Sequence, residues 1–320
     1  MKKLLILSLL ILFIAACSTS LTKTEQTKEF MGTFVTITVY HEDKQQAEKA
    51  IEQTYAEIER LDHLLSNYKN TSEVSILNEN KKLDSASNEL IYILSKSLKY
   101  GDISKGAFDI TVQPILDLYT HTFKDLNRSP TDEEIKETKK SIGYENIYIR
   151  NRYVEFTKPN MKITLGGIAT GYIVDRAIEI LKENGIKHAL INAGGDIMAI
   201  GNKGNEDWQI ALQNPRNKKE YITMIKINNT AVCTSGDYER YFDEDKKFHH
   251  IIDPKTGYSA TELISVTIIA PTALECDGLS TSVFVMGKED GLELIESLDN
   301  VEGLIITNKR EIIRSSGFSY

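Results

Sequence analysis

The stretch KITLGGIATGYIVDRAIEILKENG, residues 162–185, is the segment from which the rest of the chain is best interpreted. Residues 162–165 predict a short strand, and the two glycines after them predict a tight turn. Apolar residues then recur at helical spacing over Tyr172–Asn184, and Gly185 ends this predicted helix. A helix N-terminus after a glycine turn favours bound anions such as a diphosphate, although a plain strand–helix turn is the alternative. The G-x-G-x-x-G spacing of a Rossmann dinucleotide site is missing.

Periodicity elsewhere predicts strands and helices that alternate without regular βαβ repetition. The predicted strands are 33–40, 188–191, 208–212, 221–227, 231–234, 265–269 and 303–307, with a hairpin over 147–156. The predicted helices are 42–66, 88–100 (ended by Gly101), 274–285 and 290–298. No repeat or Pro/Gly/Ser linker divides residues 29–320, which suffice for one large domain or two closely merged ones. This order favours an α+β fold with mixed sheets over a doubly wound fold.

The N-terminus predicts export and lipidation. Lys2 and Lys3 precede an apolar run over 4–16, which is shorter than the about 20 residues of a membrane-spanning helix and is typical of a signal peptide. The residues up to Cys17 resemble a lipobox, and a plain cleaved signal peptide is the alternative. We therefore expect a signal peptide at 1–16, a lipidated Cys17 with a flexible polar tether to residue 28, and an extracytoplasmic domain at 29–320. Two or three acyl chains would anchor that domain at a membrane.

Charge and cysteine content limit the kinds of ligand and metal site that we expect. The formal net charge is -8 and no basic cluster is present, so nucleic acid is not an expected partner. An acidic domain that binds an anion needs local positive charge or a metal ion. Cys233 and Cys276 are the other cysteines, and they can form a disulfide or remain two buried thiols. Their spacing does not predict a zinc site.

Asp277 and Thr281 are candidate metal ligands. They are four residues apart on a predicted helix and so face the same way. Carboxylate and hydroxyl oxygens are hard ligands that suit magnesium, whereas a helix-terminal Asp and a buried Thr are the structural alternative. The motif from Asn192 to Asp196 (NAGGD) follows a predicted strand and is assigned to a turn that supports the site.

His250 is the candidate general base or phosphate-orienting residue, because histidine is the usual base near neutral pH. A satisfied, buried histidine is the alternative, and the adjoining His249 is hard to distinguish from it by sequence. Arg240, in the polar loop before them, can pair with Asp237 or Asp253 or reach a phosphate.

The order and spacing of these motifs together resemble the ApbE family, the FAD:protein FMN transferases, over roughly residues 29 to 320. The motifs that carry the resemblance are Met31–Thr33, Gly106–Asp109, Leu165–Tyr172, Asn192–Ile197, His250–Gly257 and Asp277–Thr281. The resemblance implies a single large domain of the ApbE or T-fold-like type. It also implies a magnesium ion held by Asp277, Thr281 and a backbone carbonyl near Gly167.

By the same resemblance, a further set of residues would contact FAD. These are Met31, Tyr68, Ala107, Phe108, Asp109, Thr164, Thr170 and Ile251. Met31 and Tyr68 would line the adenine or isoalloxazine pocket, and the segment from Ala107 to Asp109 would meet the flavin ring. The family pattern has Asp and Lys where this chain has Thr164 and Thr170, so those two positions bring no charge here.

The function implied is transfer of FMN from FAD to a Thr or Ser hydroxyl of another protein, with release of AMP. His250 and Asp277 would be the catalytic residues. The acceptors would be flavoprotein subunits of membrane redox complexes or extracytoplasmic flavoproteins. FAD hydrolysis to FMN and AMP is an alternative that uses the same residues. A flavin-binding lipoprotein without turnover is a third possibility, against which the Asp277 and Thr281 pair argues.

Overall fold

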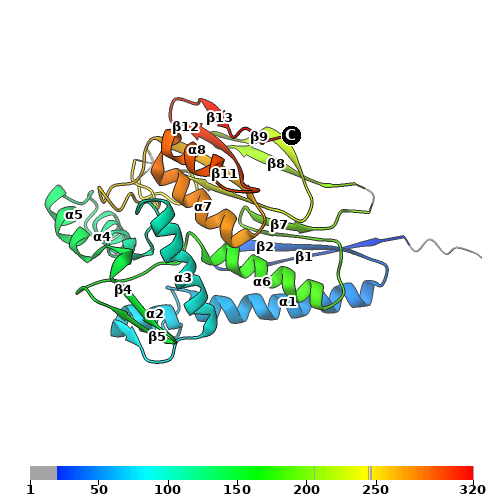
Figure 1. The fold of residues 1–320 in the computed structure, drawn as a ribbon, viewed down its shortest axis with the longest axis horizontal. Helices are drawn as coiled ribbons and strands as arrows, with labels where there is room; N and C mark the ends of the chain where they lie inside the picture. The colour runs from blue at the N-terminus through cyan, green and yellow to red at the C-terminus, as the bar shows by residue number, and fades with distance from the viewer. Residues whose placement is uncertain (1–19, 205, 244, 246, 320) are drawn as a thin grey trace, which may run out of the picture.

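The computed structural model describes residues 20–204, 206–243, 245 and 247–319, and its centre is an eight-stranded antiparallel sheet (Figure 1). In spatial order its strands are β1 (Thr22–Phe30), β2 (Thr33–His41), β6 (Ala189–Ala193), β7 (Asp196–Ile200), β10 (Ala231–Gly236), β11 (Leu263–Ala270), β12 (Glu302–Thr307) and β13 (Ile312–Arg314). The α+β class is confirmed. All neighbouring strands are antiparallel, so the sheet is more uniform than the mixed sheets predicted.

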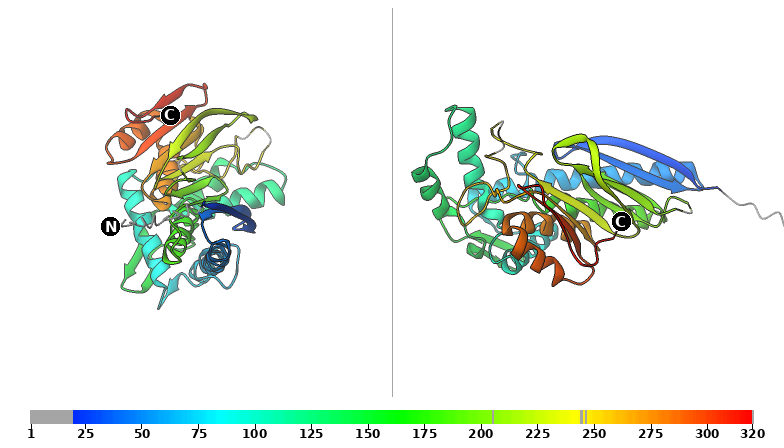
Figure 2. Two further views of the ribbon diagram at one scale, coloured as in Figure 1. Left: turned by 90° about the vertical axis from the view of Figure 1, so that its right-hand side faces the viewer. Right: turned by 90° about the horizontal axis from the view of Figure 1, so that it is seen from above.

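Helices cover one face of this sheet and a β-hairpin covers part of the other (Figures 1 and 2). The covering helices are α1 (Lys44–Leu65), α6 (Ala169–Glu183), α7 (Ala273–Met286) and α8 (Lys288–Glu296). The hairpin consists of β8 (Trp208–Asn214) and β9 (Asn217–Ile227). The sheet therefore has a large apolar core on its helical face and a smaller one under the hairpin.

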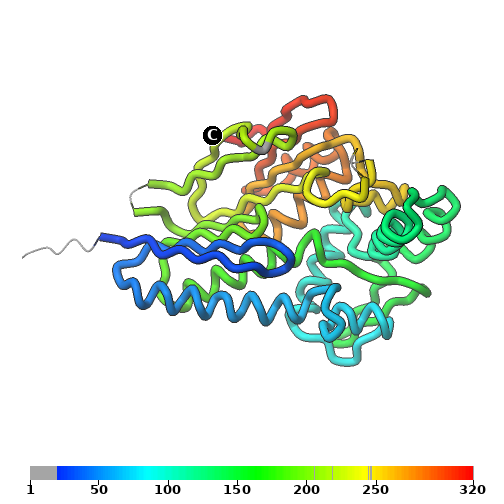
Figure 3. Tube along the Cα trace, turned by 180° about the vertical axis from the view of Figure 1, so that it is seen from behind, coloured from blue at the N-terminus to red at the C-terminus, as the bar shows by residue number. Residues whose placement is uncertain are grey.

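A third group of elements lies beyond one end of the sheet, at the left of Figure 1. Its helices are α2 (Glu73–Asn80), α3 (Asn88–Ile103), α4 (Gln113–Lys124) and α5 (Asp132–Thr138), and its small sheet has the order β3 (Lys82–Leu83), β5 (Tyr153–Phe156), β4 (Ile147–Arg150). The closed end of the β1–β2 hairpin points toward this group (Figure 3).

The alternation predicted for 33–40 explains how β2 packs. Val35, Ile37 and Val39 are buried, whereas Phe34 on the opposite side is 68% exposed. α1 begins at the N-cap Asp43, whose carboxylate accepts two backbone N–H groups, and it lies against this buried face. The Tyr55 hydroxyl of α1 bonds the carbonyls of Gln26 and Val35 at 2.7 and 2.9 Å. These contacts fix the hairpin on the helix.

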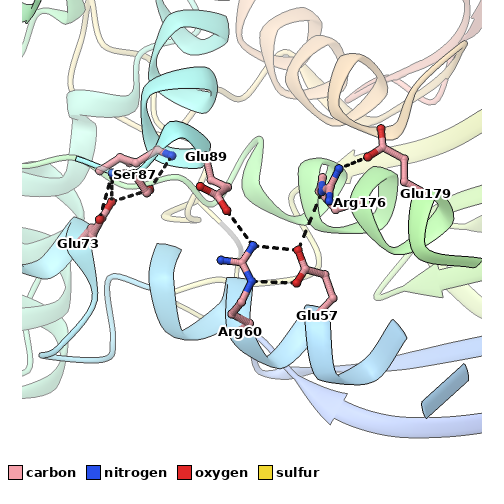
Figure 4. A network of polar contacts seen from close by, with 8 residues as sticks. Glu57, Arg60, Glu73, Ser87, Glu89, Arg176 and Glu179 are labelled. Atoms are coloured by element: carbon pink, nitrogen blue, oxygen red, sulfur yellow. Dashed lines mark hydrogen bonds and ion pairs between the residues drawn. The ribbon is translucent and has the colours of Figure 1, made fainter. Parts of the chain in front are cut away.

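Charged side chains tie α1 to α3 and α6 (Figure 4). Arg60 of α1 donates to Glu57 through Nε at 2.8 Å and to Glu89 of α3 at 2.8 Å. Arg176 of α6 lies 4.0 Å from Glu57 and also pairs with Glu179 of its own helix. The network is partly exposed, so it orients the three helices more than it stabilises them.

Two predictions near the N-terminus have different outcomes. The signal peptide of residues 1–16 and the lipidated Cys17 lie outside the described residues. The flexible tether predicted for 18–28 is wrong from Thr22 onward, because Thr22–Lys28 belong to β1 and pair with β2. Such a polar strand lacks an apolar period because it forms a sheet edge, where charged and Thr side chains are common. Within the described part of the chain, no helix combines the length and apolarity needed to cross a membrane.

Two local predictions were also wrong for tertiary reasons. Gly101 does not end its helix, since α3 continues to Ile103. A Cβ at Gly101 would lie 2.7 Å from the Tyr144 ring, so a glycine is needed there to make room for that ring. Residues 162–165 do not join a sheet. The backbone of Ile163 bonds both ends of the Asn78 carboxamide, at 2.7 and 2.9 Å, and Thr164 N donates to the Ile110 carbonyl. Side-chain and loop groups thus replace the ladder of a strand.

Candidate active site

A cleft of about 530 Å³ lies where the β1–β2 turn, the end of α1 and the start of α6 meet. It is lined by Met31, Gly32, Asp62, Leu65, Ser66, Asn67, Tyr68, Lys69, Leu165, Gly166, Ala169, Thr170, Ile173 and Arg240. Three predicted ligand-contact residues, Met31, Tyr68 and Thr170, are therefore brought together from distant parts of the sequence. Tyr68 is 80% exposed, so its ring is available to stack on a ligand.

The turn that carries Met31 is a two-residue hairpin loop. Met31 and Gly32 both have positive φ, 55° and 70°, which is the pattern of a type I′ turn. Positive φ is uncommon for a residue with a side chain, and such positions often occur at functional sites. The strained backbone places Met31 at the cleft, which supports the role that the sequence predicted for it.

The glycine turn and the start of α6 form another wall of the cleft. The N-cap residue of α6, Ile168, has no capping side chain, and the first turn contains no acidic residue. Thr164 accepts a bond from Gly166 N at 3.2 Å, so its hydroxyl stabilises the turn. Ala169 N donates to the Leu165 carbonyl at 2.8 Å and Gly171 N to Asp277 at 3.1 Å, so among the bonds found in the described residues Thr170 N is the first-turn N–H group without a partner. That group and the positive end of the helix dipole favour an anion at this position.

The three predicted metal ligands lie together beside this wall. Asp277 and Thr281 are one turn apart on α7, and a Cβ on Gly167 would lie 3.0 Å from Thr281 Oγ1. Asp277 Oδ2 accepts a bond from Gly171 N at 3.1 Å, which fixes its position. No cluster of three or more His, Cys, Asp or Glu in the described ranges is arranged to hold a metal. One carboxylate, one hydroxyl and a backbone carbonyl form the small, hard donor set that magnesium accepts when substrate and water complete its shell.

A second carboxylate lies near this centre. Burial raises the pKa of Asp277 well above its usual range, and the charge of Asp196 raises it further. Burial also raises the pKa of Asp196 to about 7. Two neighbouring carboxylates that have lost much of their hydration cannot both ionise cheaply unless a proton or a cation lies between them. This charge arrangement fits a metal ion, and it places Asp196, assigned from sequence to a supporting turn, close to the metal ligands.

Asp175 is a site-supporting residue that the sequence did not predict. It lies on α6, and its carboxylate accepts the N–H groups of Ala273 and Leu274 at 2.7 and 2.9 Å, so it caps the start of α7. Its position inside an amphipathic helix gave no signal of this contact.

The two adjacent histidines have different roles. His249 is 1% exposed; its Nδ1 accepts from Ile251 N and its Nε2 donates to the Ala260 carbonyl at 2.8 Å, so it is the satisfied, buried residue. His250 is half-buried, and its Nδ1 lies 2.9 Å from the Arg240 carbonyl. Burial lowers the pKa of His250 to about 4, which keeps the ring neutral at physiological pH. Ile251, a predicted cofactor contact, is buried and does not line the cleft.

The segment predicted to meet the flavin ring is buried behind the glycine turn. Ala107 and Phe108 are 5% and 3% exposed, and a Cβ on Gly167 would lie 3.4 Å from the Phe108 ring. Asp109 Oδ1 accepts from Thr111 N at 2.7 Å and Oδ2 from Tyr144 N at 3.1 Å. Asp109 therefore has the capping role that was its structural alternative, and the Phe108 ring packs against the glycine turn at Gly167.

The two cysteines are free buried thiols, which confirms the simpler of the two predictions for them. Asp237 does not pair with Arg240, because Arg216 holds it through two bonds, of which Nη1–Oδ1 is 2.7 Å. Arg216 was not singled out from the sequence, since its contact depends on how the β8–β9 hairpin folds back on the end of β10.

The fold is an α+β scaffold on which a glycine turn, the start of α6 and the oxygen-bearing side chains of Asp277 and Thr281 meet beside a cleft. Residues 31–305 match the model of the ApbE family, and the chain belongs to that family. It is 32% identical to the FAD:protein FMN transferase of Haemophilus influenzae over 97% of this chain and 94% of the relative. The Escherichia coli K12 protein of the same name is 30% identical over 86% of this chain and 81% of its own length.

Solved structures agree with this assignment. The crystal structure of the Thermotoga maritima ApbE protein has a TM-score of 0.84 and 33% identity, and it covers 92% of this chain and 97% of its own. The flavin transferase ApbE of Vibrio cholerae has a TM-score of 0.80 and 25% identity, covering 93% and 98%. The family and the fold predicted from the motifs are confirmed.

Proposed function

We propose that this protein transfers FMN from FAD to a Ser or Thr hydroxyl of a partner protein with the help of magnesium. The observation that carries the proposal is the juxtaposition of Asp277, Thr281 and Gly167 at the start of α6, whose N-cap residue Ile168 has no capping side chain, beside the cleft. That arrangement suits a dinucleotide whose diphosphate meets both the helix N-terminus and a metal. Named FAD:protein FMN transferases among the relatives support FAD as the substrate.

In the proposed reaction, the acceptor hydroxyl oxygen forms a bond to the FMN phosphorus, and the bond from that phosphorus to the AMP oxygen breaks. Magnesium, when bound, would offset the charge that develops on the leaving AMP. The neutral His250 ring would accept the hydroxyl proton. Its Nδ1 faces a carbonyl, which leaves Nε2 as the acceptor nitrogen. Gly171 N and the start of α6 hold Asp277 and the diphosphate in position, and such positioning supplies much of the rate in phosphoryl transfer.

We further propose an extracytoplasmic site of action at a membrane. The lipobox-like residues that end at Cys17 support a lipid anchor, and the acceptors would be flavoproteins within reach of that membrane. The anchor is tested by metabolic labelling with a fatty acid, in which Cys17→Ser should abolish the label.

The transfer is tested by incubating the purified protein with FAD, magnesium and an acceptor domain that carries a Ser/Thr-Gly-Ala-Thr/Ser motif, and by recording the acceptor's intact mass. We expect a gain of one FMN, lost in Asp277→Ala and kept in Asp290→Asn, which changes an exposed acid on α8. Free FMN and AMP without a gain in acceptor mass would instead indicate a hydrolase. Intact FAD would indicate a binding protein.

A further inference from the structure

We propose that Arg240 is a positioning residue with two linked roles: its guanidinium binds the diphosphate of the ligand in the cleft, and its backbone carbonyl selects the tautomer of His250. The inference rests on the proposed function for the identity of the ligand. It adds a residue that links ligand binding to the orientation of the base.

The charges along the cleft favour the first role. The charged side chains among the residues that line it are Asp62, Lys69 and Arg240. Lys69 Nζ is already bonded to Asp62 Oδ2 at 2.7 Å, so these two charges compensate one another. None of the ion pairs found in the described part of the chain involves Arg240. The uncompensated positive charge of the cleft is therefore the guanidinium of Arg240.

The two carboxylates that the sequence offered as partners make other contacts, and no ion pair found among the described residues joins either of them to Arg240. Asp237 is held by Arg216, and Asp253 Oδ1 accepts from Lys255 N at 2.9 Å. A guanidinium presents a planar pair of N–H donors that matches two phosphate oxygens, and the start of α6, which lines the same cleft, attracts the same anion. The ligand class that fits both is a diphosphate ester.

The second role follows from hydrogen-bond chemistry. The Arg240 carbonyl oxygen accepts a hydrogen bond from His250 N at 3.1 Å and lies 2.9 Å from His250 Nδ1. A carbonyl only accepts, so the proton of the neutral ring must be on Nδ1 and Nε2 must be the free acceptor. One residue thus contacts the base through its backbone and faces the cleft through its side chain.

The segment around Arg240 is held on both sides, so a shift of the residue must reach His250. On its N-terminal side, Asp237 is fixed by Arg216. On its C-terminal side, Tyr241 and His249 form an antiparallel β-bridge, and Phe242 N donates to the Phe248 carbonyl at 2.7 Å. Binding of a diphosphate at the guanidinium is therefore expected to change the surroundings of the His250 ring.

The first role is tested by calorimetric titration with FAD, ADP and adenosine, without any acceptor. Arg240→Met should weaken FAD and ADP binding by about tenfold or more, as expected for a lost charged hydrogen bond, and leave adenosine binding unchanged. Arg240→Lys should restore part of the affinity, and Arg150→Met, an exposed arginine on β4, should have no effect. Equal weakening of adenosine and ADP binding, or unchanged ADP binding, would overturn the first role.

The second role is tested by ¹⁵N NMR of the histidine rings in the same variants. We expect His250 in the Nδ1–H form in the free protein, and a shift of its ring signals on saturation with ADP that is lost in Arg240→Met at saturation. An Nε2–H ring, or the same shift in both proteins, would refute the link. These measurements need no turnover, so the proposal for Arg240 can be tested even if the transfer assay fails.

Discussion

Gly171 lies where α6 and α7 come closest, and replacing it with alanine tests the geometry of the whole site. A Cβ at this position would lie 2.2 Å from the Ala273 carbonyl oxygen and 2.8 Å from Leu274 Cα. Normal contacts between carbon and oxygen are about 3.3 Å or longer, so the helices would have to separate by roughly 1 Å. Both atoms that block the Cβ belong to backbone, which cannot rotate away as a side chain can.

The cost of that separation follows from packing. A gap of about 0.5–1 Å forfeits a quarter to a half of the dispersion energy across the contact, and overpacked core positions cost about 1–3 kcal/mol. Alanine regains about 1 kcal/mol of helix propensity over glycine. Because the displaced Gly171 N–H also loses its bond to Asp277, we expect a net loss of about 2 kcal/mol in the free energy of unfolding. The magnesium affinity should fall by about tenfold or more, the range seen when groups that orient a metal ligand are changed.

Urea unfolding monitored by circular dichroism gives the first quantity, and calorimetric titration with magnesium gives the second. Gly166→Ala is the matched control for stability, because its Cβ would meet Thr164 Oγ1 at an ordinary 3.4 Å. Its unfolding midpoint should stay close to that of the unchanged protein. If Gly171→Ala unfolds at the same urea concentration and binds magnesium equally well, the close approach of the helices is not what positions Asp277.

Three further predictions concern single groups. Burial lowers the pKa of His250 in the folded protein to about 4, so the neutral ring stabilises the fold above the unfolded pKa near 6.5, and this stabilisation is lost as the pH falls toward 4. Urea unfolding should therefore show about 2 kcal/mol less stability at pH 5 than at pH 7, and His250→Gln should reduce that difference. Asp175→Ala should lower the free energy of unfolding by about 1–2 kcal/mol through loss of the α7 cap, with Asp175→Asn between the two proteins; equal stability of all three would refute the capping role. Cys233 and Cys276 should resist alkylation in the native protein and react after denaturation without reductant, as read by peptide mass mapping; a disulfide-linked peptide pair would contradict this.

Local periodicity predicted most of the strands and helices that form the core. The alternation over 33–40 and the helical spacing of Ala47, Ile51 and Ile58 reflect burial on one face, and these residues are buried as expected. β1 was not predicted because an edge strand with a polar sequence carries no such pattern. The sequence predicted the end of a helix at Gly101, whereas a glycine is needed there because the Tyr144 ring, which is distant in sequence, leaves no space for a Cβ.

The candidate site was predicted where a motif carries its own chemistry. Their spacing alone predicts that Asp277 and Thr281 share a helix face, and two consecutive glycines predict the turn before α6. Contacts between motifs could not be predicted, since they depend on how separate elements pack. Asp196 near Asp277, and the difference between His249 and His250, required the positions of neighbouring donors and acceptors.

The packing of α6 on α7 explains why the start of α6 and Asp277 form one structural unit. Gly171 lets the two backbones touch and donates to Asp277, while Asp175, one turn later on the same face of α6, holds the first N–H groups of α7. Both residues belong to the stretch that begins at Lys162. A movement of the start of α6 must therefore carry Asp277 with it. The spacing between the glycine turn and the Asp277 carboxylate is set by the backbone contact at Gly171 together with the bonds that the Asp277 and Asp175 carboxylates accept.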